Sequence, residues 1–262
     1  MTPMYVLVLL AGVVDPKHPL PSQIDAESLL KARASRPLLS PFDEAALEIA
    51  LKLRDADPKT EISAMVIAAS ESDPLLRTVA GFRLASTAGV AATCLPAWDA
   101  AAAARAIARA LRTHAPEPQL ILIGREFGDG DDGSLPAALA AALAMPYASL
   151  SLSIDVESSH ARLLRQSGNG LERCCLPLPL VASITNDPQN RLRHPLLKNV
   201  MAAKKMQFSF INILPETPTL RIASSIAAAT PERTSRCELL GGGPAAQAAA
   251  LAKLLQKAAS AT

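Results

Sequence analysis

A short glycine-rich stretch, GREFGDGDDGSLP, spans residues 124–136 and follows an apolar run, QLILIG. Glycines directly after a predicted strand are typical of a turn that holds a ligand, most often a phosphate. This turn also carries four acidic residues: Glu126, Asp129, Asp131 and Asp132. Carboxylates at short spacing attract hard cations, but the spacing lacks the pattern of a calcium loop and its distal glutamate. We therefore expect no metal site, and a phosphate loop and a turn without any ligand both stay open.

Two predicted helix starts carry groups that suit an anion. Ser40 can cap a helix that has Pro41 at its first position, and Asp43 completes the pattern of a capping box. Gly133 and Ser134 precede a second apolar helix. Free backbone N–H groups and the positive end of the helix dipole favour a phosphate at such a start, whereas the neighbouring acidic residues oppose it. Capping without a ligand is the alternative interpretation.

Catalytic signatures are missing from the sequence, which contains no GxSxG, HExxH or Walker A motif. The histidines are far apart in the chain, and we expect each on the surface or in a loop: His18, His114, His160 and His194. No two cysteines form a CxxC pair, and the adjacent Cys174 and Cys175 point to opposite faces of a predicted strand. The sequence thus predicts no catalytic residue, no zinc or disulfide framework, and a reducing cytoplasmic compartment.

The overall composition narrows the classes of function. Half of the 262 residues are hydrophobic but only 3% are aromatic, which suits small-faced helices packed on a sheet. A formal net charge of +2 gives no support to nucleic-acid binding. No apolar run approaches the roughly 20 residues of a membrane span, so we expect no membrane insertion. The N-terminal MTPMYVLVLL lacks a basic leader and indicates a first strand rather than a signal peptide.

Predicted strands and helices alternate along the first part of the chain. Apolar runs predict buried strands at residues 5–14, 62–70, 90–95 and 119–124. Amphipathic or alanine-rich stretches predict helices at residues 40–58, 72–86, 98–112 and 135–143. This alternation predicts an α/β fold, a doubly wound and mostly parallel sheet with flanking helices. The loops after the strands then lie along one edge of the sheet.

The pattern changes after Tyr147. SLSLSIDV alternates with period two, SGNG at residues 167–170 is a hairpin signal, and LERCCLPLPLVASIT predicts a strand interrupted by Pro177 and Pro179. We therefore expect an antiparallel extension of the sheet near an edge, where proline is tolerated. A loop and a short basic helix follow at residues 187–206.

The chain ends in GGGPAAQAAALAKLLQKAA, a flexible hinge and an amphipathic helix. Such a helix suits either a partner or docking on its own domain, and the two interpretations are not separated by the pattern. We divide the chain into an α/β domain of the nucleotide-binding type at residues 1–212 and a C-terminal arm at residues 213–262, which contacts a partner subunit.

Five stretches, in the same order, resemble the beta subunit of electron-transfer flavoproteins over roughly residues 4–212. SPFDEAALEIALKL is similar to the family's NPFDE-type helix, and LLRTVAGFRLASTAGV to its LRTALAMGAD segment. LILIGREFGDGDDGS falls where the family has a strand followed by GKQxxDDDxNQTG. NGLERCCLPLPLVASIT resembles GGLExxxLPLPAVVT, and RHPLLKNVMAAKK resembles RYPxLxNIMKAKK.

The resemblance implies a non-catalytic electron carrier. Family members pair with an alpha subunit that holds most of the FAD contacts, and the heterodimer carries electrons from flavin-dependent dehydrogenases to a membrane quinone reductase. The beta subunit also buries an AMP, or a second FAD in electron-bifurcating members. Phe42 would lie near the alpha subunit's flavin, and Leu197, preceded by Leu196, would dock into partner dehydrogenases. The resemblance places cofactor-binding positions at Leu9, Ser40, Pro41, Phe42, Asp43, Gly124, Arg125, Asp129, Asp131, Gly133, Ser134 and Leu135.

Departures from the family pattern concern the mononucleotide. The family's first-loop lysine is absent beside Ala11 and Gly12, and NQTG is replaced by residues 133–136, where Pro136 brings no N–H donor. Three alternatives therefore stay open for the mononucleotide: the backbone alone holds it, the nucleotide is altered, or it is absent. A freestanding adenine-nucleotide-binding α/β protein, acting as a binding protein or hydrolase, is the alternative from another class. A bifurcating carrier with a second FAD is the alternative within the family.

Overall fold

A computed structural model describes residues 3–17, 37–91, 95, 99–114, 117–213, 216–220 and 239–260. The chain forms two compact units, Met1–Ser225 and Ile226–Thr262, and each is described by itself. The predicted domain boundary after residue 212 stays a prediction. His18, Cys94 and Cys237 lie outside the described residues, as does most of the polar loop after the first strand.

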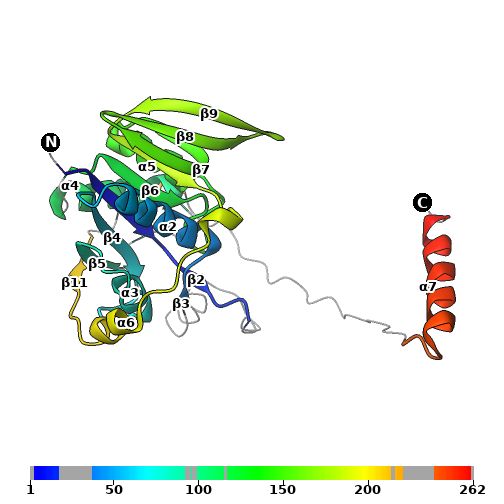
Figure 1. Cartoon of the computed structure of the whole chain (residues 1–262). Coiled ribbons are helices and arrows are strands. Elements are labelled where there is room, and N and C mark those ends of the chain that lie inside the picture. Colours follow the sequence, from blue (N-terminus) through cyan, green and yellow to red (C-terminus); the bar gives the residue numbers. More distant parts are fainter. Residues whose placement is uncertain are drawn as a thin grey trace. The chain divides into compact units, whose positions relative to one another are not determined.

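The first unit is built on a nine-stranded sheet in the order β11-β5-β4-β1-β6-β10-β7-β8-β9 (Figure 1). Its strands are β1 (Tyr5–Leu10), β4 (Glu61–Ala68), β5 (Ser86–Ala91), β6 (Leu120–Gly124), β7 (Tyr147–Glu157), β8 (His160–Ser167), β9 (Gly170–Pro177), β10 (Leu180–Ile184) and β11 (Ser209–Ile211). Neighbours from β11 to β7 pair in parallel, whereas β7, β8 and β9 pair antiparallel. The predicted α/β class with an antiparallel extension is confirmed.

Helices cover both faces of the parallel part. One face carries α2 (Pro41–Ala56), α3 (Pro74–Ala80) and α6 (Leu197–Ala203), and the other carries α4 (Ala100–His114) and α5 (Leu135–Leu143). Successive β1 side chains enter the two cores in turn, since side chains of a strand alternate between faces. Val6, Val8 and Leu10 pack beneath α2 and α3, and Leu7 and Leu9 beneath α4 and α5. The unbroken apolar run of β1 follows from this burial on both sides.

The first strand is shorter than the apolar run predicts. β1 ends at Leu10, and Gly12 turns the chain with a positive φ of 68°. Residues 13–14 then form β2 (Val13–Val14), which pairs antiparallel with β3 (Pro37–Leu38). The prediction of one strand over residues 5–14 is wrong because hydrophobic periodicity does not register a glycine turn between apolar residues.

The next helix and strand are also shifted from their predicted positions. α3 begins after Asp73, which accepts a hydrogen bond from the Leu75 N–H (2.9 Å), and it ends before Gly81. β5 therefore starts at Ser86, where the Ser86 hydroxyl donates to Ser63 Oγ on β4 (2.8 Å). The predicted helix over residues 72–86 is too long, and the strand predicted at residues 90–95 begins earlier.

The stretch predicted as one proline-interrupted strand is two strands with different environments. β9 is the edge strand beside β8, and Pro177 ends it. The chain then turns through a cis Leu178–Pro179 bond, and β10 returns to the centre of the sheet between β6 and β7. All five residues of β10 are buried. The prediction of a single strand near the edge is wrong for β10, because the burial of a strand depends on its position in the sheet.

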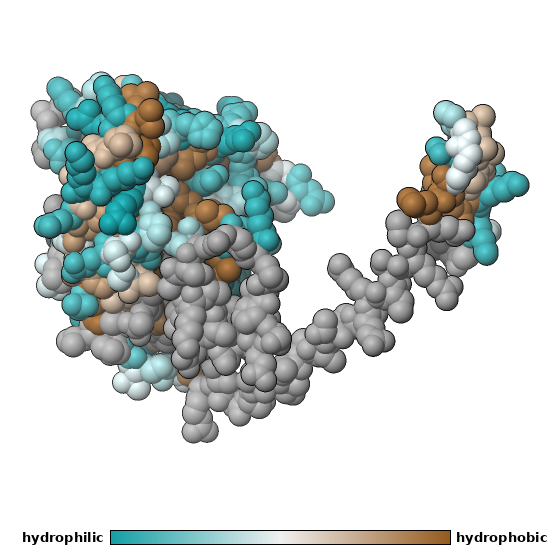
Figure 2. All heavy atoms as spheres, turned by 90° about the horizontal axis from the view of Figure 1, so that it is seen from below, coloured by the Kyte–Doolittle hydropathy of each residue, from teal (hydrophilic) through white to brown (hydrophobic). Residues whose placement is uncertain are grey.

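The second unit contains α7 (Pro244–Ala259), which confirms the predicted C-terminal helix. None of its residues is buried, and its hydrophobic side chains gather on one side of the helix (Figure 2). Within the described ranges, no helix combines the length and the hydropathy that a bilayer crossing requires.

Candidate functional site

The carboxyl ends of the central strands bring several predicted residues together at one edge of the sheet. α2 begins there, directly after the segment that leaves β3 (Figure 1). Ser40 Oγ accepts a hydrogen bond from the Asp43 N–H (3.0 Å), and the Asp43 carboxylate accepts one from the Ser40 N–H (3.1 Å), which confirms the predicted capping box. Asp43 also accepts from the N–H groups of Gly12 (3.0 Å) and Ala11 (3.4 Å).

Asp43 is fully buried, and its contacts tie the turn after β1 to the start of α2. Burial raises the pKa of its carboxyl, and the hydrogen bonds from Ser40, Gly12 and Ala11 oppose that rise because they favour the charged form. The side chain is thus part of the scaffold of the site.

Phe42 and Arg125 are both partly open to solvent at this edge. A Cβ on Gly124 would lie 3.0 Å from Phe42 Cβ, so glycine at the end of β6 permits the close approach of α2. The Arg125 guanidinium lies 5.0 Å from the centre of the Phe42 ring, a cation–π contact. Arg125 is 40% exposed and its Nη2 pairs with Glu126 Oε1 at 2.8 Å. A partly buried aromatic ring beside a cation could hold the edge of a flat, conjugated ligand.

The acidic loop after β6 folds its carboxylates onto its own backbone. Asp131 accepts hydrogen bonds from the N–H groups of Phe127 (2.9 Å), Ser134 (3.1 Å) and Leu135 (3.1 Å). Asp132 accepts a second bond from the Ser134 N–H (3.2 Å), and hydrogen bonds from Ser134 lower the pKa of the Asp132 carboxyl. Gly133 has a positive φ of 94°, which glycine adopts without strain.

Three further predicted positions make contacts within the chain itself. Leu9 is buried in the core beneath α4 and α5, so its side chain belongs to the packing of the sheet. Asp129 accepts a hydrogen bond from the Val14 N–H (3.0 Å) and thereby joins the loop after β6 to β2. Leu135 is also buried against the core at the first position of α5.

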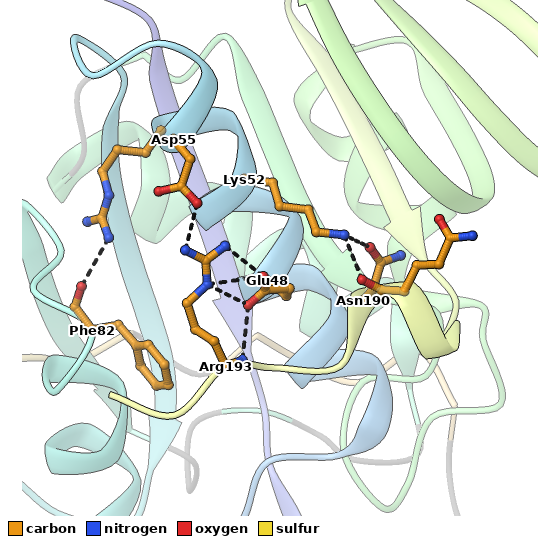
Figure 3. Close-up of polar contacts among 8 residues, drawn as sticks. Glu48, Lys52, Asp55, Phe82, Asn190 and Arg193 are labelled. Atoms are coloured by element: carbon orange, nitrogen blue, oxygen red, sulfur yellow. Dashed lines mark hydrogen bonds and ion pairs between the residues drawn. The ribbon is translucent and has the colours of Figure 1, made fainter. Parts of the chain in front are cut away.

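A second cluster, which sequence reasoning missed, holds the chain between η2 (Pro188–Asn190) and α6 against the side of α2 (Figure 3). Glu48 of α2 is 5% exposed, and its carboxylate accepts from Arg193 Nη2 (2.7 Å), from Arg193 Nε (3.1 Å) and from the Arg193 N–H (3.1 Å). Arg193 Nη1 reaches Asp55 Oδ2 at 2.6 Å. Lys52 Nζ donates to Asn190 Oδ1 (2.9 Å) and to the Gln189 carbonyl (2.6 Å).

The Glu48–Arg193 pair, which we call the clamp, fixes the segment that leads to the predicted docking leucines. The hydrogen bonds to Glu48 are the largest cause that raises the pKa of Arg193, so the guanidinium stays charged. Beyond the clamp, Leu196 and Leu197 are 61% and 77% exposed. Both leucines are therefore open to solvent, and their docking on dehydrogenases stays a prediction. A signal existed in the sequence, because Glu48 interrupts the apolar face of α2 and such a residue needs a buried partner.

The other candidate residues are placed as follows. His160 and His194 are exposed, and Cys174 and Cys175 are free thiols on β9. Across the described part of the chain, no group of three or more His, Cys, Asp or Glu side chains is arranged to hold a metal ion.

The chain is similar in sequence to known proteins over the part that carries these features. The sequence model of the electron transfer flavoprotein domain matches residues 30–212, which contain the start of α2, the acidic loop and the clamp. The chain belongs to the electron transfer flavoprotein domain family. The resemblance found in the sequence motifs is thereby confirmed.

Relatives of this electron transfer flavoprotein domain are beta subunits. The chain is 30% identical to the electron transfer flavoprotein subunit beta of Bradyrhizobium diazoefficiens over 170 residues, 64% of the chain and 65% of that relative. It is 33% identical to the mitochondrial subunit beta of Oryza sativa subsp. indica over 171 residues, 63% of the chain and 65% of that relative. With the subunit beta of Mycobacterium bovis it shares 26% identity over 220 residues, 79% of the chain and 81% of that relative. The match to the first two relatives thus spans just under two thirds of their length.

Proposed function

We propose that this chain is the beta subunit of a heterodimeric electron-transfer flavoprotein and that it carries electrons without substrate chemistry of its own. The observation that carries the proposal is the meeting of Phe42 and Arg125 at the carboxyl edge of the sheet in a chain of this family. FAD held mainly by an alpha subunit would supply the redox chemistry, between flavin-dependent dehydrogenases and a quinone reductase.

The residues at the edge fit one side of a flavin. Phe42 offers a flat apolar face that excludes water, and Arg125 offers a positive charge beside it. Ser40, Pro41 and Asp43 hold Phe42 in place through the capping box at the start of α2. Gly124 lets the end of β6 lie against Phe42. These contacts support a role for the chain in shaping the flavin pocket.

Leu196 and Leu197 are proposed to dock on dehydrogenases. Both are exposed, and Leu197 is the first residue of α6, which also carries Lys198. Lys204 and Lys205 follow directly after the helix and are exposed. An apolar anchor ringed by charge is the usual composition of a binding centre, in which charges guide association and the apolar group supplies affinity.

The C-terminal arm is proposed to contact the alpha subunit. Leu251, Leu254 and Leu255 of α7 are 49%, 51% and 62% exposed, and their spacing places them on one side of the helix. A helix with an apolar side and no buried residue is suited to a groove on a partner.

Co-expression with an electron-transfer flavoprotein alpha subunit tests the proposal. We expect a stable pair that copurifies with FAD and that a flavin-dependent dehydrogenase reduces. Heat denaturation and separation of the released cofactors distinguish the alternatives. A monomeric chain that ignores the alpha subunit and binds ATP tightly would support the freestanding nucleotide-binding protein. Two FADs per pair would support a bifurcating carrier.

The docking role is tested by Leu197→Ala in the same pair. Removal of a side chain that contributes about 1.4 kcal/mol to binding raises the KM of the dehydrogenase for the pair roughly tenfold. The FAD content of the pair stays unchanged. Leu171→Ala is the matched control, because Leu171 is a similarly exposed leucine (65%) on β9. Equal KM values for the two variants would refute docking at Leu197.

A further inference from the structure

The resemblance implies that the family's beta subunits hold an adenine mononucleotide, and it places the phosphate at the start of α5. A helix start binds a phosphate through backbone N–H groups that have no other partner, aided by the positive end of the helix dipole. The residues around the start of α5 decide whether such donors are available in this chain.

The donors at the start of α5 are already used by a carboxylate of the same loop. Asp131 accepts from the N–H groups of Ser134 and Leu135, both at 3.1 Å, and from that of Phe127 at 2.9 Å. The next residue, Pro136, has no N–H group. A phosphate in this position would have to displace Asp131 from three hydrogen bonds.

The facing turn after β1 is satisfied in the same way. Asp129 accepts from the Val14 N–H at 3.0 Å, and Asp43 accepts from the Gly12 N–H at 3.0 Å. Gly128 brings the loop after β6 against this turn, since a Cβ on Gly128 would lie 3.4 Å from Ala11 Cβ. Carboxylates of the chain therefore join both loops.

This loop also lacks groups that would hold a phosphate. The polar side chains of the family's NQTG are replaced by Gly133, Ser134, Leu135 and Pro136, of which only Ser134 carries a polar side chain. The nearest cation in the loop is Arg125, and it is paired with Glu126 through Nε (3.0 Å) and Nη2 (2.8 Å). A phosphate here would meet carboxylates and no uncommitted cation of the loop.

We propose that Asp131 replaces the phosphate of the mononucleotide, so that this chain closes its own site and retains no adenine mononucleotide. The carboxylate supplies the negative charge at the start of α5 and the acceptors for its N–H groups, and the loop after β6 keeps its conformation without a cofactor. The proposal rests on the proposed function only in that the family membership locates the site.

The first test counts the cofactors that the purified alpha–beta pair releases on heat denaturation. We expect FAD and no AMP, ADP or ATP. One equivalent of AMP per pair would overturn the proposal. Absence of FAD would instead count against the proposed function. The experiment therefore distinguishes failure of this proposal from failure of the proposed function.

The second test uses AMP and inorganic phosphate as probes with the purified full-length chain. We expect the melting temperature of the wild-type chain to be unchanged by either probe, because ligands stabilise only a protein that binds them. Asp131→Ala frees the N–H groups of Phe127 and Leu135 and leaves that of Ser134 with Asp132 alone, and we expect a lower melting temperature that added phosphate or AMP partly restores. Asp155→Asn, an exposed aspartate on β7, is the control and should behave like the wild type.

Asp131→Asn separates charge from shape, because it keeps the side-chain volume and one acceptor oxygen while removing the negative charge. Asp131→Asn also takes the place of the alanine variant in this test if that variant fails to fold. We expect a smaller loss of stability for asparagine than for alanine. An AMP-induced rise in the melting temperature of the wild-type chain would overturn the proposal. So would an Asp131→Ala chain that melts with the wild type and ignores both probes.

Discussion

Replacement of Arg193 by methionine tests whether the clamp holds the docking segment on α2. The variant removes three side-chain contacts to Glu48 and one to Asp55, and it leaves the Glu48 carboxylate with the Arg193 N–H alone. Breaking a fully buried ion pair costs about 3–5 kcal/mol because one charge stays buried without its partner. Arg193 is 40% exposed, so water screens part of this effect.

We therefore expect a loss of about 2–3 kcal/mol in the free energy of unfolding. Asp55 adds little, because it is 54% exposed and surface pairs contribute less than about 1 kcal/mol. For a unit of this size, the loss corresponds to a decrease of roughly 4–12 °C in melting temperature. Arg193→Lys keeps the charge but loses the fork that contacts both carboxylate oxygens, and we expect a loss of about 1 kcal/mol.

Urea unfolding of the full-length chain measures the loss, with Arg173→Met as the matched control. Arg173 is an exposed arginine on β9 that has no ion pair among the described residues. Limited trypsin digestion supplies a local readout, since Lys198, Lys204 and Lys205 lie in the segment that the clamp holds, and we expect faster cleavage there. Equal unfolding midpoints for the two methionine variants, with equal rates of cleavage, would refute the role of the clamp.

Further substitutions test the site and its supports. In Asp43→Asn, the side-chain NH2 group cannot accept hydrogen bonds from the backbone N–H groups that the carboxylate binds. Urea unfolding should show a loss of about 2–4 kcal/mol in the free energy of unfolding. An unchanged midpoint would contradict the scaffold role. Gly12→Ala places a Cβ 2.7 Å from Leu75 Cδ1 at positive φ, and calorimetry should show a larger loss than Gly168→Ala, where positive φ is combined with open space. Hydrogen bonds led by the Ala102 N–H lower the pKa of Asp99. This carboxylate therefore stabilises the fold above its ordinary pKa of 3.8 and loses that effect as the pH falls below it, so unfolding of Asp99→Asn should depend less on pH in that acid range.

The local features of the sequence predicted much of the site. The capping box of Ser40 and Asp43 depends on residues three positions apart, and α5 begins and ends where its apolar stretch does. Such features are local, because a helix start satisfies its own N–H groups and a helical period is set within a few turns. The alternation of strands and helices was likewise enough to predict the α/β class.

Other features depend on segments that are distant in the chain. β9 and β10 follow each other closely in the chain, yet one is an edge strand and the other is central, because the position of a strand in the sheet is set by its partners. The clamp joins Glu48 to Arg193 across 145 positions, and neither residue alone indicates the pairing.

The acidic loop shows the division between sequence and tertiary structure most directly. The sequence by itself determined that glycines and carboxylates follow a buried strand and precede a helix, and it left a phosphate and simple capping as alternatives. Only the folded chain decided which atoms meet, by turning Asp131 onto the N–H groups of Ser134 and Leu135. The physical reason is that a backbone donor is available to a ligand only when no acceptor of the same chain reaches it first, and that reach is set by three-dimensional geometry.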